Sequence, residues 1–200
     1  MESNYQRIID RNLDDLFSLD LMDRSAAMGA ELQEQTLSFK AFGGRCRVTP
    51  EGITIDETSQ QGPLGIILSL YALHAVPDPI QLAPFKAFKE FPNSMPYVGA
   101  FASHTEQILV ASVDRILRRQ QRIMDAMQGD PAPADVGGDS ALLIRPLPKI
   151  ALCYIFYEAD DDFPPSATCL YSCNANAFMP MDGLADVGEY SSKAILELLG

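Results

Sequence analysis

The chain has 200 residues, of which 47% are hydrophobic, so it can bury one substantial core and is not a disordered protein. Its formal charge of −12 disfavours nucleic acid as a partner, because an acidic surface repels phosphate backbones. No apolar stretch approaches the roughly 20 residues that cross a bilayer, and the polar N-terminus lacks the pattern of a secretion signal. We therefore expect a cytoplasmic protein whose four cysteines are free thiols, with no membrane partner.

Hydrophobic periodicity predicts two N-terminal helices, over residues 4–17 and 21–32. Alternating polar and apolar residues then predict strands at 36–42, 45–48 and 53–55, with glycine-containing turns between them. This pattern is typical of an antiparallel meander. The residues of the first two strands that we expect to face the core are Leu37, Phe39, Cys46 and Val48.

The segment that follows Gly62-Pro63 has almost no polar face, which predicts a central buried helix that ends near Pro77. Ser103-His104-Thr105-Glu106 fits a capping box, in which the Ser and Glu side chains bond to amide groups of the first helical turn. It would start a long amphipathic helix with an apolar stripe from Ile108 to Met127. Residues 129–140 are rich in Gly, Pro, Ala and Asp and predict a flexible surface loop.

The C-terminal third predicts two strands and a helix. Residues 150–157 form a continuous apolar run that suits a buried strand, and residues 167–173 suit its neighbour. Residues 184–198 predict an amphipathic helix with i,i+4 charge pairs among Glu189, Lys193 and Glu197. The elements together predict an α+β fold, in which residues 1–200 form a single domain and several helices pack against one antiparallel sheet.

An acidic cluster stands between the last two predicted strands, before a Phe-Pro-Pro-Ser turn. Converging carboxylates could bind calcium or magnesium, or act as general acid and base. However, consecutive residues of an extended chain point in opposite directions, and no calcium-loop spacing is present, so a solvated turn that caps the Pro164-Pro165 corner is the alternative. The sequence leaves open whether this Pro-Pro bond is cis. The carboxylates are Glu158, Asp160, Asp161 and Asp162.

Four arginines at i, i+3, i+4 and i+7 predict a cationic stripe on one helix face. This stripe could dock an acidic partner or a second copy of the chain, or it could be a solvated face with local ion pairs such as Asp114 to Arg118. A homodimer is therefore left open. The four residues are Arg115, Arg118, Arg119 and Arg122.

The aromatic and cationic segment at residues 85–91 has two interpretations. Its phenylalanines and lysines could hold an anionic planar ligand by stacking and charge, or the rings could anchor the core while the lysines extend outward. We expect the ligand site to join this segment to the acidic corner. The candidate ligand-binding residues are Phe85, Lys86, Phe88, Lys89, Asp161, Asp162, Phe163 and Ser166.

Cysteines and histidines give weaker signals. Strand pairing could bring Cys153, Cys169 and Cys173 together, but the Cys-x-x-Cys pairs typical of zinc and iron–sulfur sites are absent. In a strand, Cys169 and Cys173 would be about 13 Å apart, too far to chelate one ion. Neither His74 nor His104 has a partner identifiable in the sequence. No P-loop, Gly-x-Ser-x-Gly or Gly-x-Gly-x-x-Gly motif occurs, which disfavours the common nucleotidases, hydrolases and dehydrogenases.

Three segments, at residues 37–48, 66–101 and 148–199, together resemble the domain-of-unknown-function family 3786, found mainly in anaerobic bacteria and archaea. The most specific part is Asp-Asp-Phe-Pro-Pro-Ser at 161–166. Some members of that family accompany corrinoid or one-carbon proteins, and some carry an iron–sulfur segment that this chain lacks. The chain also has Tyr171-Ser172 where the family usually has an acidic Phe-Asp pair. The resemblance implies an accessory role in anaerobic metabolism and supplies no catalytic residues.

We therefore expect a non-enzymatic accessory or ligand-binding domain, with neither its cofactor nor its ligand defined by the sequence. One alternative is a metal-dependent or acid–base enzyme that uses the acidic corner. The other is a protein-interaction module that uses the arginine stripe.

Overall fold

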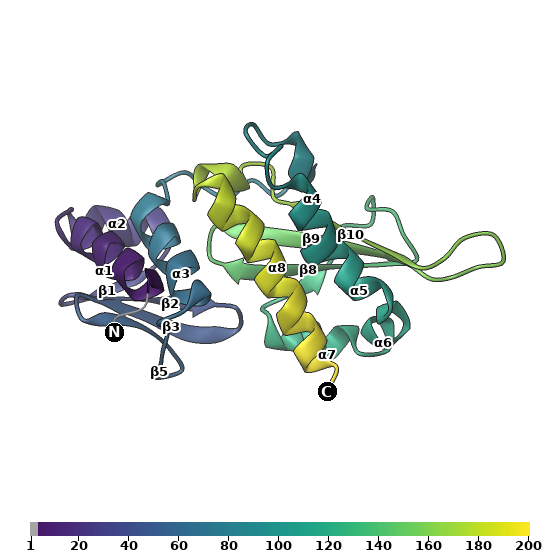
Figure 1. The fold of residues 1–200 in the computed structure, drawn as a ribbon, viewed down its shortest axis with the longest axis horizontal. Helices are drawn as coiled ribbons and strands as arrows, with labels where there is room; N and C mark the ends of the chain where they lie inside the picture. The colour runs from purple at the N-terminus through teal and green to yellow at the C-terminus, as the bar shows by residue number, and fades with distance from the viewer. Residues whose placement is uncertain (1–3) are drawn as a thin grey trace.

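The computed structural model describes residues 4–200, which form two lobes side by side (Figure 1). Residues 1–3, part of the polar segment that argued against a secretion signal, lie outside the described residues. Within 4–200 the strands form two antiparallel sheets of five strands each, which confirms the α+β class, although one sheet was predicted. No helix in this range is both long and apolar enough to cross a membrane.

The N-terminal lobe contains the first sheet, in the order β1-β2-β3-β4-β5, and three helices. The predicted meander is confirmed. The second predicted helix ends earlier than residue 32, because Gly29 adopts φ +69° and its N–H bonds back to Ala26, so that the next residues form β1. The elements are α1 (Asn4–Phe17), α2 (Leu21–Met28), β1 (Glu31–Gln33), β2 (Thr36–Ala41), β3 (Gly44–Thr49), β4 (Gly52–Ile55), β5 (Thr58–Ser59) and α3 (Pro63–His74).

The C-terminal lobe contains the second sheet, in the order β6-β10-β9-β8-β7. Its strands are β6 (Lys86–Ala87), β7 (Asp130–Pro131), β8 (Ser140–Leu147), β9 (Ile150–Tyr157) and β10 (Ser166–Tyr171). Strands β7 and β8 were not predicted, and both take residues from the loop expected at 129–140. The helical elements are η1 (Phe88–Glu90), α4 (Val98–Phe101), η2 (Ala102–Gln107), α5 (Ile108–Val110), α6 (Val113–Arg118), α7 (Gln120–Ala126), η3 (Ala175–Ala177) and α8 (Met181–Leu198).

The capping box predicted at Ser103 is wrong, because the chain is already helical from Val98 onward. Ser103 lies within a helix and its hydroxyl donates to the Gly99 carbonyl at 3.0 Å. The long helix expected to follow is divided at Ser112 and Arg119, where the backbone leaves the helical conformation with ψ angles of 5° and 13°. Its predicted apolar stripe still faces the interior, with Leu109, Val113, Ile116, Ile123, Met124 and Met127 buried.

The two lobes share one hydrophobic core, and Tyr71 of α3 connects them by hydrogen bonds. Its buried hydroxyl donates to the Met28 carbonyl at 2.6 Å and accepts the Lys149 N–H at 3.1 Å. The Phe42 N–H also donates across the junction, to the Pro146 carbonyl at 2.8 Å. The junction is thus packed and bonded, in keeping with one folding unit.

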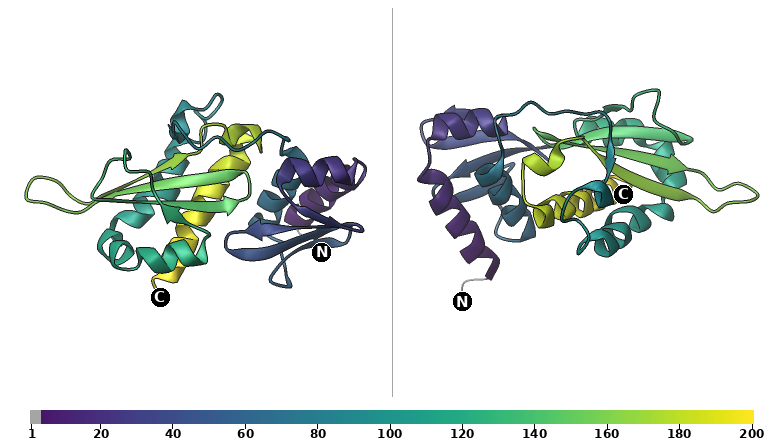
Figure 2. Two further views of the ribbon diagram at one scale, coloured as in Figure 1. Left: turned by 180° about the vertical axis from the view of Figure 1, so that it is seen from behind. Right: turned by 90° about the horizontal axis from the view of Figure 1, so that it is seen from above.

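The helices of the C-terminal lobe cover one face of the second sheet, as the view from above shows (Figure 2). Connecting segments cover the opposite face, where Ile80, Leu82 and Phe85 pack near buried Cys153. The hairpin that joins β9 to β10 projects well beyond the body of the molecule (Figures 1 and 2).

Candidate functional site

The acidic corner forms the tip of the β9–β10 hairpin, where its carboxylates are exposed. Asp160 caps the turn itself, because one of its carboxylate oxygens accepts the N–H groups of Asp162 (2.8 Å) and Phe163 (2.7 Å). Nowhere in residues 4–200 do three His, Cys, Asp or Glu side chains converge to hold a metal ion. The corner is therefore a solvated turn that Asp160 caps.

The cysteines are free thiols, as expected. Burial raises the pKa of the Cys153 thiol to about 11 and raises that of Cys169 well above its ordinary value. In the pairing of β9 with β10, Cys153 lies opposite Leu170 and Cys169 lies opposite Tyr154, so these two thiols point to opposite faces of the sheet and pack in different clusters.

The helix expected to carry the arginine stripe is divided at Arg119, and all four arginines, Arg122 included, are exposed. Arg115 and Arg119 turn toward the C-terminus of α8, where both donate to the Leu199 carbonyl, Arg115 at 2.9 Å. Cations at this position stabilise a helix through its unsatisfied carbonyls and its dipole. Arg118 forms the predicted local pair with Asp114 (2.7 Å). A docking role for this face stays a prediction.

The surface predicted to join residues 85–91 to the acidic corner is also not formed. Lys86 pairs with Tyr171, at the end of β10 opposite to Ser166. Five residues of a strand separate these positions by about 16 Å. Asp161, Asp162 and Phe163 lie farther still, on the hairpin tip.

Part of the 85–91 segment anchors the core. The Phe88 ring stacks on Phe101 with a centroid distance of 4.4 Å, and the Phe91 ring contacts Tyr171 edge-on. The Lys86 ammonium lies 5.6 Å from the centre of the Phe91 ring. The aromatic residues were therefore correctly considered as core anchors.

Phe88 and Lys89 nevertheless line a cleft, with partners that sequence reasoning did not identify. The cleft has a volume of about 330 Å³ and lies between η1, the α4–η2 helix and β10. This size and mixture of apolar walls with few polar groups is typical of small ligand sites. Its apolar walls are Phe88, Val98 and Phe101, and its polar groups are Lys89, Glu106 and Thr168.

Glu106 is the chemically distinctive residue of this cleft. Its Oε1 accepts the backbone N–H of Cys169 at 3.0 Å, whereas Oε2 accepts no hydrogen bond from any residue that the structure describes. Half-burial raises the pKa of the Glu106 carboxyl, and this shift is opposed by the Cys169 N–H and by the nearby Lys89 ammonium. The cleft thus presents a partly desolvated carboxylate with one oxygen unused.

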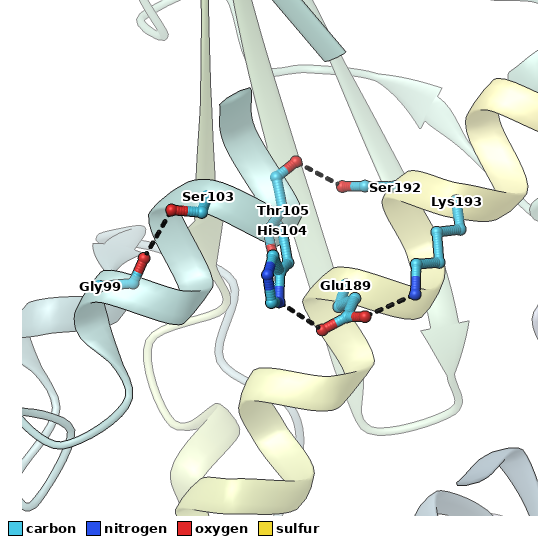
Figure 3. A network of polar contacts seen from close by, with 7 residues as sticks. All are labelled: Gly99, Ser103, His104, Thr105, Glu189, Ser192 and Lys193. Carbon is cyan, nitrogen blue, oxygen red and sulfur yellow. Dashed lines mark hydrogen bonds and ion pairs between the residues drawn. The ribbon is translucent and has the colours of Figure 1, made fainter. Parts of the chain in front are cut away.

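The segment that carries Glu106, η2, is a π-helical turn. Such turns are rare and occur frequently at functional sites. The Thr105 carbonyl in this turn accepts the hydroxyl of Ser192 on α8 at 2.7 Å (Figure 3). Ser192 in turn contacts the Tyr154 hydroxyl at 2.9 Å. The turn is therefore fixed to both α8 and the sheet, which holds Glu106 in place.

The opposite side of the same turn carries His104, which contacts Glu189 of α8 at 3.2 Å (Figure 3). Lys193 also donates to Glu189, at 2.5 Å, which confirms one predicted i,i+4 pair. The Lys193 hydrogen bond is the main cause that lowers the pKa of the Glu189 carboxyl. His104 and Lys193 are exposed and Glu189 is partly buried, and their contacts connect two helices at the surface.

The comparison with protein families agrees with the resemblance described above. The sequence matches the profile of a family described as a domain of unknown function (DUF3786) over residues 20–194, so the chain belongs to that family. The match includes every residue that lines the cleft. Searches among the curated proteins and among the solved structures gave no match.

Proposed function

We propose that this member of the DUF3786 family is a non-enzymatic binding domain, which takes a ligand with a cationic hydrogen-bond donor at the Glu106 cleft. The main observation that supports this proposal is the half-buried Glu106 carboxylate, one oxygen of which accepts no hydrogen bond within the described residues. An ammonium or guanidinium group there would form a charge-assisted hydrogen bond with that oxygen and relieve its incomplete solvation.

The apolar walls of the cleft define the second part of the ligand. Val98 and the edges of the stacked rings of Phe88 and Phe101 border the cleft beside the carboxylate, so an apolar group attached to the cation would contact them. A binding role is favoured over catalysis because the hydrogen bonds of residues 4–200 join Glu106 to no histidine, hydroxyl or thiol side chain.

The broader setting of this proposal is an accessory role in anaerobic metabolism, in the cytoplasm, which the resemblance supports. We also propose that residues 1–200 act as one domain, because the two lobes share a core.

Benzylamine is a simple test compound, because it combines an ammonium group with an apolar ring. We expect it to shift the NMR signal of the Cys169 amide, which shares Glu106 with the ligand. Glu106→Gln should weaken binding by about 10-fold or more, since a charge-assisted hydrogen bond contributes about 1.5–3 kcal/mol. Glu51→Gln, at an exposed carboxylate of the other lobe, is the matched control and should bind normally.

Benzyl alcohol, which lacks the charge, should bind much more weakly than benzylamine. Equal binding of benzylamine by the wild-type protein and Glu106→Gln, or no binding by either protein, would contradict the proposed function.

A further inference from the structure

We infer that the cation at Glu106 is the lysine or arginine side chain of an extended peptide from a partner protein, which adds as a strand to the open edge of β10. This inference rests on the proposed function and names its ligand class.

The outer edge of β10 is only partly covered by another strand. β6 pairs with Leu170 and Tyr171 and then ends, because the chain turns into η1 at Phe88. Among the strands of residues 4–200, none pairs with this edge from Ser166 to Cys169. An uncovered strand edge is a template for another extended chain, and several peptide-binding domains use it in this way.

One hydrogen bond shows which backbone N–H and C=O groups of β10 point outward at this edge. The Cys169 N–H points away from β9, since it bonds to Glu106. Alternate residues of an antiparallel strand direct their polar groups to the same side, so the N–H and C=O groups of Ala167 also point away from β9. Neither group has a partner elsewhere in the described chain. An added strand would supply the missing partners.

Two hollows flank this open edge, one near each end. The Glu106 cleft reaches β10 at Thr168, and a second groove of about 390 Å³ reaches the chain at Pro165. Three residues of an extended chain separate them, about 10 Å. Side chains on one face of an added strand recur at every second residue, about 7 Å apart, so with a lysine in the Glu106 cleft the side chain two positions along would lie toward the second groove. Val110 and Val113 in the second groove suit an apolar side chain.

The charges around the edge favour a basic peptide. Glu106 lines the cleft, and Glu158 lines the second groove together with Asp114, which Arg118 already pairs. Lys89 is the one cation among the residues lining these two hollows. The whole chain carries a formal charge of −12, which adds long-range attraction for a basic partner.

The test uses capped pentapeptides with a central lysine and Val, Thr or Leu at the other positions, titrated into the full chain. We expect the best of them to bind at least about 10-fold more tightly than benzylamine, because the edge adds backbone hydrogen bonds to the cation contact. Replacing the lysine by norleucine should remove this gain, as should Glu106→Gln.

Backbone pairing is tested by N-methylation of alternate peptide nitrogens. In strand addition only one alternate set of N–H groups faces β10, so methylating that set should abolish binding and methylating the other should leave it intact. Ala167→Pro removes an edge N–H without removing one from the β9 ladder, and proline is tolerated on edge strands. This variant should lose peptide binding and keep benzylamine binding.

The two proposals fail in different ways. If benzylamine binds through Glu106 but no peptide binds more tightly, or if both methylated sets bind like the parent peptide, strand addition is wrong and the binding domain stands. If neither benzylamine nor any lysine peptide is sensitive to Glu106→Gln, the proposed function itself is wrong.

Discussion

The two lobes differ in how completely their buried polar groups are hydrogen-bonded. In the N-terminal lobe these groups have partners that join one element to another. Asn12 of α1 donates to the Ser69 hydroxyl of α3 at 2.9 Å, and Arg24 of α2 donates to the Ala72 carbonyl at 2.6 Å. The helices there are regular and the sheet is a simple meander.

The C-terminal lobe has irregular helices and unpartnered buried hydroxyl groups. Its first long helix contains a π-helical turn and two interruptions. The hydroxyls of Ser94, Thr105 and Ser191 are buried without a hydrogen-bond partner in the described part of the chain. Glu106 is held half-buried with a raised pKa. Local departures from good packing and satisfied polarity tend to gather at functional sites, so this contrast supports the site proposed in the second lobe.

The largest expected effect tests how tightly the π-helical turn is packed. Gly188 of α8 faces it, and a Cβ there would lie 2.6 Å from both the Phe101 ring and the Tyr171 hydroxyl. We expect Gly188→Ala to destabilise the protein by about 3 kcal/mol, because the clash involves rigid buried groups. Gly99→Ala, in α4, is the control, since its Cβ would meet nothing within 4 Å. Chemical denaturation measures both, and equal midpoints would show that the turn is loosely packed.

The second prediction tests the junction between the lobes. Tyr71→Phe leaves the Met28 carbonyl and the Lys149 N–H without their shared partner in a buried site. We expect a loss of about 2 kcal/mol in the free energy of unfolding, since each unsatisfied buried group is costly. The control is Tyr5→Phe, whose ring is exposed. A Tyr71→Phe variant that unfolds in two separate transitions would contradict one cooperative unit.

The same contrast explains which features could be predicted from the sequence. Along β2 and β3, buried residues such as Leu37 and Val48 alternate with more exposed ones. This alternation of apolar and polar residues is a local property that can be seen directly in the sequence. The Ser103–Glu106 pattern was equally clear but misleading. Val98 to Phe101 had already formed a helix, so Ser103 was an interior residue, and the cap chemistry had no helix end to satisfy.

The candidate site was only half predictable for a related reason. Phe88 and Lys89 were identified because aromatic and cationic residues stand together in the sequence. Glu106 was assigned to a cap, since its bond to the Cys169 N–H spans 63 residues and depends on where β6 stops covering β10. The spacing of the arginine stripe assumed an unbroken helix, and the break at Arg119 has no signal in the sequence such as a glycine or a proline.

A smaller effect follows from the electrostatics of Glu106. Its folded-state pKa is raised mainly by desolvation, so its ionised form destabilises the folded protein at neutral pH. This cost disappears as the pH falls through the folded pKa and below the ordinary range of glutamate. Gln retains an acceptor for the Cys169 N–H without the charge. We therefore expect Glu106→Gln to be at least as stable as wild type at pH 7, with any gain vanishing in acid.

Denaturation curves at pH 7 and in acid measure this difference. A clear loss of stability in Glu106→Gln at pH 7 would mean that the carboxylate is a structural bracket for β10. Unchanged or greater stability combined with weaker benzylamine binding would instead mean that this residue serves the ligand at the expense of stability, as functional residues often do.

The smallest expected effect concerns the surface contacts that Glu189 makes with His104 of the π-helical turn and with Lys193. Glu189→Ala removes the contacts to His104 and Lys193, and because these two partners are exposed we expect a loss below about 1 kcal/mol that salt reduces further. The pKa of Glu189 is lowered, so its contribution is present above the ordinary glutamate range and is lost as the pH falls through the folded pKa. Glu197→Ala, on the same helix, is the control. If Glu189→Ala also changed benzylamine affinity several-fold, the surface contacts would set the position of Glu106; unchanged affinity would show that the buried Thr105–Ser192 bond is sufficient.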